Sequence, residues 1–454
     1  MEFNPNIFRE YDIRGIAGED LDEEKMEHMG LAYCQFLRPK KHKTVVVGRD
    51  GRLSSKAYSR ALIDGLVAGG LDVIDIGEVP SPVLYYALNV LKVDGGFMLT
   101  ASHNPGNYNG LKIAIGTKTI YGEQIQKFRK VVEHGEFKTT NKPVTITRMD
   151  LAPRYMKRIL RDVKLARPLK VVVDAGNGVG GVVAVPLFEE MGCEVIPLFC
   201  EVDGNFPNHH PDPTKKENLK DLMRAVKKHK ADVGIGFDGD VDRIGGCDNK
   251  GNMLSGDRLL ALFARQILKE KPGATIIGEV KCSRNMYQDI EKHGGVPLMW
   301  RTGHSHIKSA MIEHKAQLAG EMSGHIFFKH RWYGFDDAIY SAARLLEIVA
   351  AGKKPLSDHL ATIPEWPITP EIEVDCPDDK KFDVVKQATD YFQKELGLDV
   401  VTIDGARVEF TDGWGLLRAS NTSPKLIMRM EAEKPARLRK IRKLIEDKVH
   451  ELVD

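Results

Sequence analysis

Three stretches of the chain share one pattern of apolar and polar positions. Each begins with an apolar run of strand length and ends in a turn that contains glycine or aspartate. About one helix length then separates it from a second apolar run. The first runs are TVVVGRDGR from Thr44, KVVVDAGNGVGG from Lys170 and ATIIGEVKCSR from Ala274, and the second runs begin near Gly69, Met191 and Gly294. Strand, crossover helix and strand at this spacing form a βαβ unit, which predicts a mainly parallel sheet.

The threefold repeat of this pattern predicts three α/β domains of similar topology. Their expected bounds are residues 1–148, 149–252 and 253–363. A chain of 454 residues is longer than one hydrophobic core usually organises, and about three or four domains are the usual number for such a length.

The pattern changes after a segment with three prolines, TIPEWPITPE at residues 362–371. Proline interrupts helices and central strands, so this segment is expected to be a linker. Beyond it, the strand-like VVTIDGARVEF precedes a glycine turn, and a charged helix, ARLRKIRKLIEDKVHELVD, follows. We therefore predict a smaller α+β domain over residues 364–454, joined through a hinge that lets it move.

Charge and cysteine content narrow the class of protein. Lys and Arg (66) nearly balance Asp and Glu (64), which gives no indication of a nucleic-acid or membrane surface as partner. The six cysteines show no CxxC spacing, so they are expected to be reduced thiols rather than a disulfide frame or a zinc site. No secretory signal and no apolar run of the ~18–20 residues needed to span a membrane is visible. We expect a soluble cytoplasmic protein with no obligate protein partner.

The strongest metal signal is DVGIGFDGDVDRIG at residues 232–245. Asp238, Asp240 and Asp242 alternate after an apolar strand, at the end where α/β sheets place their ligands. Three carboxylates this close repel one another unless a cation such as Mg²⁺ neutralises them. An EF-hand is excluded, because its sixth and twelfth positions would be Arg243 and Asn249. A phosphatase of the haloacid dehalogenase type, with Asp238 as nucleophile, stays an alternative.

Three further stretches carry candidate chemistry. TASHNPGNYNGLK at residues 100–112 places Ser102, His103 and Lys112 in what is otherwise a turn-forming sequence. LAGEMSGHIFF at residues 318–328 alternates Glu321, Ser323 and His325, which would face one side if the segment is extended, a suitable arrangement for adjacent sugar hydroxyls. RASNTSPKL offers an arginine fork and a set of donors that can cradle a phosphate. These donors are Arg418, Ser420, Asn421, Thr422 and Ser423.

Isolated residues add little by themselves. Tyr11 and Arg14 lie in EYDIRG just before a glycine turn, while Lys281 and His304 lie at expected strand ends of the third domain. Each alone is more often an ordinary solvated or buried side chain than a functional one.

The order and spacing of these loops, taken together, resemble the α-D-phosphohexomutase superfamily. The resemblance covers essentially the whole chain, from YDIRG through TASHNPGNYNGLK, DGDVDR and GEMSGH to RASNTSPKL. GEMSGH, with Met322 in the variable place, is similar to the bacterial phosphomannomutase/phosphoglucomutase branch, whereas the phosphoglucosamine branch usually carries Gln there. The implied fold is α/β, with three similar mixed or parallel-sheet domains and a smaller C-terminal α+β domain around a central cleft.

The resemblance also implies a role for each domain and for the residues of the first two. In order, the domains carry the phosphoserine loop, the metal, the sugar-recognition residues and the phosphate site. Ser102 is the phosphoryl carrier, and its phosphoserine completes an Mg²⁺ site with the three aspartates. Arg14 and Arg243 hold the remaining phosphoryl oxygens, and His103 supports the loop. Lys112 is a candidate general acid/base, which requires its pKa to be lowered by neighbouring cations.

The implied reaction interconverts the 1-phosphate and 6-phosphate of mannose, glucose or both through a hexose 1,6-bisphosphate, with glucose 1,6-bisphosphate as activator. Glu321 and Ser323 would accept the 3- and 4-hydroxyls, and His304 and His325 would line the cleft. The phosphate that is not reacting would bind to Arg418, Ser420, Asn421, Thr422 and Ser423, with Tyr11 and Lys281 as further candidates. A phosphoglucosamine mutase, a metal-dependent sugar-phosphate phosphatase and a non-catalytic sugar-phosphate binding protein stay as alternatives.

Overall fold

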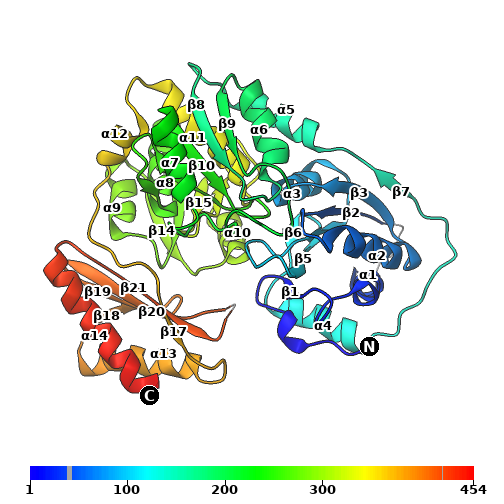
Figure 1. The fold of residues 1–454 in the computed structure, drawn as a ribbon. Coiled ribbons are helices and arrows are strands. Elements are labelled where there is room, and N and C mark those ends of the chain that lie inside the picture. The colour runs from blue at the N-terminus through cyan, green and yellow to red at the C-terminus, as the bar shows by residue number, and fades with distance from the viewer. Residues whose placement is uncertain (38–42, 422, 454) are drawn as a thin grey trace. The chain divides into compact units, whose positions relative to one another are not determined.

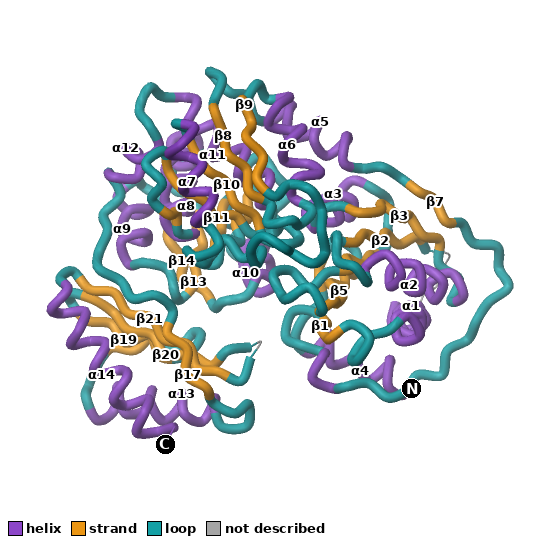
Figure 2. Tube along the Cα trace, viewed as in Figure 1, coloured by secondary structure: helices purple, strands orange, loops and turns teal. Residues whose placement is uncertain are grey.

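The computed structural model describes residues 1–37, 43–421 and 423–453, and the chain divides into two compact units. Unit 1 comprises Met1–Gly256 and Ser323–His359, and unit 2 comprises Asp257–Met322 and Leu360–Asp454. The predicted third domain, residues 253–363, therefore contributes to both units. Figures 1 and 2 show the helices and strands of each unit. No helix among the described residues is both long and apolar enough to cross a membrane.

The first module of unit 1 is a seven-stranded mixed sheet with helices packed on it. The strands are β1 (Ile13–Ile16), β2 (Thr44–Arg49), β3 (Asp72–Glu78), β4 (Gly95–Leu99), β5 (Tyr108–Ile115), β6 (Lys118–Thr119) and β7 (Ile146–Arg148), in the order β1-β5-β4-β2-β3-β7 with β6 beside β5. The helices are η1 (Pro5–Ile7), α1 (Glu23–Leu37), α2 (Ser55–Ala68), α3 (Ser81–Val90) and α4 (Glu123–His134).

Parallel pairing in this sheet decides where its functional loops lie. β2 pairs in parallel with both β3 and β4, whereas β5 runs antiparallel to β4. All five residues of β4 are buried, as expected for a strand covered on both faces. Because β2 and β4 are parallel neighbours, the loops that follow them emerge at the same edge of the sheet.

The second module of unit 1 has a five-stranded sheet in the order β12-β11-β10-β8-β9. Its strands are β8 (Lys170–Asp174), β9 (Glu194–Leu198), β10 (Val233–Phe237), β11 (Ile244–Asp248) and β12 (Met253–Leu254), and its helices are α5 (Ala152–Asp162), α6 (Gly180–Glu190) and α7 (Lys220–His229). β8 pairs in parallel with β9 and β10, and β11 returns antiparallel to β10. Unit 1 also holds β16 (Ile326–Phe328) and α11 (Ala338–Ala351), and α12 (Leu356–Ala361) begins in it.

Unit 2 contains a parallel sheet in which β13 lies between two partners, β14 and β15. The strands are β13 (Thr275–Glu279), β14 (Val296–Trp300) and β15 (Leu318–Gly320), and the helices are α8 (Gly256–Glu270), α9 (Arg284–Lys292) and α10 (His304–Glu313). The three strand pairs predicted from the apolar runs are therefore present and parallel: β2 with β3, β8 with β9, and β13 with β14.

The C-terminal module of unit 2 is the predicted smaller α+β domain. Its five strands lie in the order β17-β21-β20-β19-β18, and all neighbours are antiparallel. They are β17 (Ile372–Asp375), β18 (Asp399–Val401), β19 (Ala406–Phe410), β20 (Gly413–Ala419) and β21 (Lys425–Ala432). Two helices, α13 (Lys381–Asp390) with its π-helical extension Tyr391–Glu395 and α14 (Pro435–Val453), pack on each other and on this sheet.

The contact between α1 and α2 depends on two glycines. A Cβ at Gly65 would lie 2.0 Å from the backbone oxygen of Glu27, and a Cβ at Gly30 would lie 2.5 Å from that of Leu62. The two helix backbones thus approach too closely for any side chain at either position.

We predict that Gly65→Ala lowers the free energy of unfolding by about 1–3 kcal/mol, the usual cost of overpacking, despite alanine's better helix propensity. Denaturation followed by circular dichroism measures the change. Asp64→Ala, on the exposed face of the same helix, is the matched control and should not destabilise. Equal stability of the two variants would contradict the close packing.

Candidate active site

Ser102 and the three aspartates meet where β4 and β10 end. Ser102 lies three residues after β4, and Asp238 directly follows β10. The Oγ atom of Ser102 donates a hydrogen bond of 2.8 Å to Oδ2 of Asp238, and both residues are buried. The structure thus brings together two motifs that are 136 residues apart in the sequence.

The backbone of Ser102 is in an unusual conformation. Its φ is +50°, in the left-handed region that residues other than glycine and asparagine rarely adopt. Its N–H donates to Oγ1 of Thr100 at 2.8 Å, and its Oγ lies 3.1 Å from Nδ1 of His103. A Cβ at position 239 would lie 2.5 Å from the carbonyl oxygen of Ser102, so only glycine permits this approach. Backbone strain of this kind is often found at functional sites.

The three aspartates form a compact group of buried carboxylates. One oxygen from each lies within 4.8 Å of the others. Burial raises the pKa of Asp238 well above its ordinary value, and repulsion from Asp242 and Asp240 adds to this rise. Such a group needs positive charge nearby.

The residues present fit a divalent cation. Oδ1 of Asp240 is buried and has no hydrogen-bond partner among the described residues, while its Oδ2 accepts from Oγ of Ser81 at 2.6 Å. An all-oxygen donor set is the kind that Mg²⁺ prefers over softer metals. Asp238, Asp240 and Asp242 are therefore the residues that could hold such an ion.

Lys112 lies directly against this acidic group. Its ammonium is 2.8 Å from Oδ2 of Asp240 and forms a second ion pair with Asp242. Burial lowers the pKa of Lys112, but the fields of Asp240 and Asp242 outweigh this effect and raise the pKa well above its ordinary value. We expected neighbouring cations to lower the pKa of Lys112. In the structure its neighbours are carboxylates, and its pKa is raised instead.

Arg243 and His325 extend the site on its other side. Arg243 donates from its backbone N–H to Oδ1 of Asp238 at 3.1 Å, and its Nε lies 3.2 Å from Nε2 of His325. The same Nε2 lies 3.1 Å from Oδ1 of Asp242, and Nδ1 of His325 lies 3.3 Å from Oγ of Ser323. The structure therefore brings these three predicted residues into one hydrogen-bonded chain.

Glu321, Ser323 and His325 would share one side only if their segment were extended. The structure shows that the segment 321–325 is not extended. It forms a turn between β15 and β16, with Gly324 at φ +90°. A Cβ at Gly324 would lie 2.3 Å from the backbone oxygen of Ile244, so the turn packs against β11. Glu321 belongs to unit 2 and Ser323 to unit 1.

Residues near the N-terminus reach the serine loop from β1. Arg14 forms an ion pair of 2.7 Å with Asp12 and donates to Oδ1 of Asn104 at 2.8 Å. Tyr11 lies in the bend just before β1. Burial and the nearby Arg243 and Arg14 lower the pKa of His103 well below its ordinary value, so its ring is neutral near pH 7.

Unit 2 holds the remaining predicted residues. Glu321 is buried, and its Oε1 accepts from the N–H of Gly303 at 2.6 Å. His304 is the buried first residue of α10. Lys281 is buried two residues after β13 and forms an ion pair of 2.7 Å with Glu371. Burial lowers the pKa of Lys281, but Glu371 outweighs this and raises the pKa above its ordinary value.

The predicted phosphate loop follows β20. Arg418, near the end of that strand, donates from Nε to Oδ2 of Asp404 at 3.1 Å. The N–H of Ser423 donates to Oγ of Ser420 at 3.2 Å, and Asn421 lies between these two serines. Thr422 lies outside the described residues.

Sequence reasoning missed four residues that hold these loops. Ser81 binds Asp240, and Arg52 binds the loop of Ser102. Asp404 orients Arg418, and Nζ of Lys381 donates to the carbonyl oxygens of Ser420 and Ser423. Of these four, only Arg52 could have been found from the sequence, because it ends TVVVGRDGR, a run predicted to be a parallel strand and its following turn.

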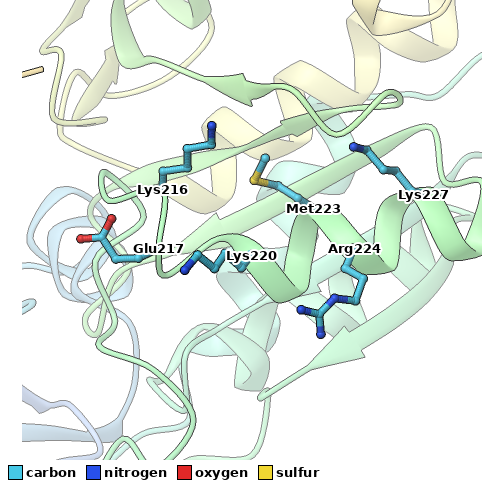
Figure 3. Close-up of a pocket in the computed structure, with 6 residues that line it drawn as sticks. All are labelled: Lys216, Glu217, Lys220, Met223, Arg224 and Lys227. Carbon is cyan, nitrogen blue, oxygen red and sulfur yellow. The ribbon is translucent and has the colours of Figure 1, made fainter. Parts of the chain in front are cut away.

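A surface hollow on unit 1 is lined by none of these residues. It has a volume of about 500 Å³ and is lined along α7 and the turn before it by six side chains, none of them predicted site residues (Figure 3). These are Lys216, Glu217, Lys220, Met223, Arg224 and Lys227.

Four domain descriptions of one family match the chain in order. They are the phosphoglucomutase/phosphomannomutase α/β/α domains I, II and III, at residues 5–139, 153–251 and 255–366, and the C-terminal domain, at residues 371–448. The chain belongs to the phosphoglucomutase/phosphomannomutase family. This confirms the predicted superfamily, the four-domain α/β fold and the enzyme class, an intramolecular phosphotransferase.

Relatives support the assignment over almost the full length. A phosphomannomutase/phosphoglucomutase of Pseudomonas aeruginosa is 49% identical over 437 residues, which cover 96% of this chain and 94% of the relative. A phosphoglucomutase of Neisseria gonorrhoeae is 45% identical, covering 96% and 95%. The crystal structure of a family protein from Burkholderia thailandensis superposes with a TM-score of 0.93 at 45% identity, covering 99% of this chain and 98% of that one.

We predict that Asp240→Asn weakens Mn²⁺ binding at least about tenfold, because it removes one charge from the oxygen ligand set. Titration of Mn²⁺ followed by electron paramagnetic resonance measures the affinity without requiring turnover. Asp221→Asn, a half-exposed position on α7, is the control and should bind as the parent does. Unchanged affinity in Asp240→Asn would place the cation elsewhere.

Proposed function

We propose that this chain interconverts hexose 1-phosphates and hexose 6-phosphates, with glucose, mannose or both as the sugar, through a phosphoserine at Ser102. The observation that carries the proposal is the hydrogen bond from Oγ of Ser102 to Asp238, within a buried group of three carboxylates. The protein is a mutase that interconverts hexose phosphates, as its relatives over nearly the whole length indicate.

In the proposed reaction, phosphorylated Ser102 gives its phosphoryl group to the free hydroxyl of the substrate. The bond between phosphorus and Oγ breaks, a bond to the sugar oxygen forms, and the hydroxyl proton passes to a base in the site. Lys112 is our candidate for this proton transfer, because it is buried against Asp240 and Asp242. It can accept the proton only after losing its own, which a bound cation beside it would favour. The product of the step is a hexose 1,6-bisphosphate.

The second half of the reaction is the reverse transfer from the other end of the sugar. The bisphosphate turns over, and its other phosphate returns to Oγ of Ser102. Added glucose 1,6-bisphosphate would phosphorylate Ser102 by the same step and so activate the enzyme.

A Mg²⁺ ion held by Asp238, Asp240, Asp242 and the phosphoserine would neutralise the charge of the transferring phosphoryl group. The orphaned oxygen of Asp240 supports this assignment. Arg14 donates to the carbonyl oxygen of Ala101 and to Asn104, on either side of Ser102 in the loop, and the backbone N–H of Arg243 donates to Asp238. These contacts support a role for both arginines in holding phosphoryl oxygens. His103 supports the loop through its contact with Ser102.

Recognition must serve both orientations of the substrate. We assign the phosphate that is not reacting to the loop of unit 2 with Arg418, Ser420, Asn421, Thr422 and Ser423, assisted by Lys281 and Tyr11. Asp404 presents the guanidinium of Arg418, which suits bidentate binding of a phosphate. We assign the 3- and 4-hydroxyls to Glu321 and Ser323, with His304 and His325 beside the sugar. Because glucose and mannose differ only at C2, such a site would accept both.

Incubation with glucose 1,6-bisphosphate should add one phosphoryl group to the protein, detected as intact mass, and Ser102→Ala should gain none. A coupled assay should show conversion of glucose 1-phosphate to glucose 6-phosphate with little release of inorganic phosphate. Ser54→Ala, a serine in another loop of the same module, is the control for nonspecific labelling. Stoichiometric phosphate release would instead indicate a phosphatase.

Replacing Arg418 by alanine should weaken binding of glucose 1-phosphate by about 1.5–3 kcal/mol, because a charged hydrogen-bond donor is lost. Calorimetric titration in a Ser102→Ala background excludes turnover from the measurement. Arg442→Ala, which removes an exposed pair with Glu446 on α14, is the matched control. If both variants bind the sugar phosphate equally, the phosphate is held by other residues.

A further inference from the structure

One buried arginine, Arg52, holds the loop that carries Ser102 from its inner side. We propose that Arg52 is a positioning residue for phosphoryl transfer, because it fixes the backbone from which Oγ of Ser102 projects. The inference rests on the proposed function in that it takes Ser102 as the phosphoryl carrier. Arg52 itself touches no reacting atom.

Four hydrogen bonds run from the guanidinium of Arg52 to the serine loop. Nη2 donates to the carbonyl oxygens of Ser102 at 2.8 Å and Asn104 at 2.6 Å. Nη1 donates to those of Pro105 at 2.6 Å and Tyr108 at 3.0 Å. The planar guanidinium of Arg52 therefore binds the serine loop at four carbonyl oxygens between residues 102 and 108.

Asp50 fixes the guanidinium in turn. Nε of Arg52 donates to Oδ2 of Asp50 at 3.1 Å, so all five N–H groups of the side chain have partners. Oδ1 of Asp50 accepts from Oγ of Ser55 at 2.6 Å, at the start of α2. The side chain of Arg52 has no exposed surface. Loss of the bond to Ser102 would remove a buried hydrogen bond from the carbonyl oxygen of the serine itself.

The topology of the sheet explains why these residues meet. Arg52 lies three residues after β2, and Ser102 lies three residues after β4. The two strands are parallel neighbours, with Arg49 opposite Leu99 in the register. The loops therefore leave the same edge side by side, and an arginine in one can span the other.

The second module of unit 1 covers the arginine from outside. The ring of Phe206 lies 5.2 Å from the guanidinium carbon of Arg52, in a cation–π contact. Phe206 has a φ of +50°, and a Cβ at Gly204 would lie 2.6 Å from the backbone nitrogen of Leu53. The segment 204–206 thus packs directly on the turn that carries Arg52.

These contacts account for the persistence of the strained serine. A φ of +50° at Ser102 is kept only where the surroundings over-determine it, and here its carbonyl oxygen is bound by Arg52 and its N–H by Thr100. Displacement of a reacting group by about 1 Å can reduce a rate on the order of a hundredfold. Lysine keeps the charge but offers three donors and no planar fork, so it cannot restore the four contacts.

The test is Arg52→Lys, assayed for transfer from the phosphorylated enzyme to glucose 1-phosphate by rapid quench, together with kcat, KM and the thermal midpoint. We expect kcat and the transfer rate to fall at least about tenfold, while KM changes less than about twofold, because the assigned substrate-binding residues are untouched. Arg49→Lys is the matched control, since Arg49 ends β2 and its side chain pairs with the exposed Glu78. A folded Arg52→Lys enzyme with parental kcat, or with a rise in KM alone, overturns the proposal.

If Arg52→Lys does not fold, Phe206→Leu provides the test of the proposal. It leaves the arginine in place but removes its aromatic cover, and we expect about a threefold fall in transfer rate at unchanged KM. A folded Phe206→Leu enzyme with the parental rate would then overturn the proposal. The proposed function fails separately, if the parent enzyme gains no phosphoryl group or if Ser102→Ala still gains one.

Discussion

The hydrogen bond between Ser102 and Asp238 joins two sheets of unit 1, and the candidate-site residues of that unit are arranged around it. It forms because each residue leaves the carboxyl end of a buried strand, β4 in one module and β10 in the other. Gly239 makes the approach possible by having no side chain against the serine carbonyl. Ser81 adds a second link between the same modules, through Asp240. A serine hydroxyl and an acidic group that follow strands of separate sheets are thereby held at hydrogen-bonding distance.

Much of this arrangement could be predicted from the sequence. Apolar runs followed by glycine turns identified β2, β8 and β13 and their parallel partners, and the alternating aspartates after β10 indicated a cation site. Parallel strands place their following loops at one edge, so the pattern carried spatial information. The loops themselves, in their order and spacing, identified the family.

Other features could not be predicted, for physical reasons that concern individual residues. The turn at 321–325 depends on Gly324 in the left-handed region, which breaks the alternation that the sequence suggests. The raised pKa of Lys112 depends on which charges surround it, and these come from another module. The position of Arg52 could be guessed from its strand, but its carbonyl partners depend on the path of a loop that contains no charged acceptor.

The charges buried around Ser102 have a consequence for the fate of a doubly phosphorylated sugar. The ammonium of Lys112 lies against Asp240 and Asp242, and Arg14 and Arg243 lie close by. In the proposed reaction a serine phosphate adds about −1.5 to −2 charges, and this charge would leave the protein with each transfer. The enzyme would then be more cationic than before, at the moment when its ligand is most anionic. Electrostatic attraction would therefore oppose escape of the proposed bisphosphate while it turns, although no covalent bond retains it.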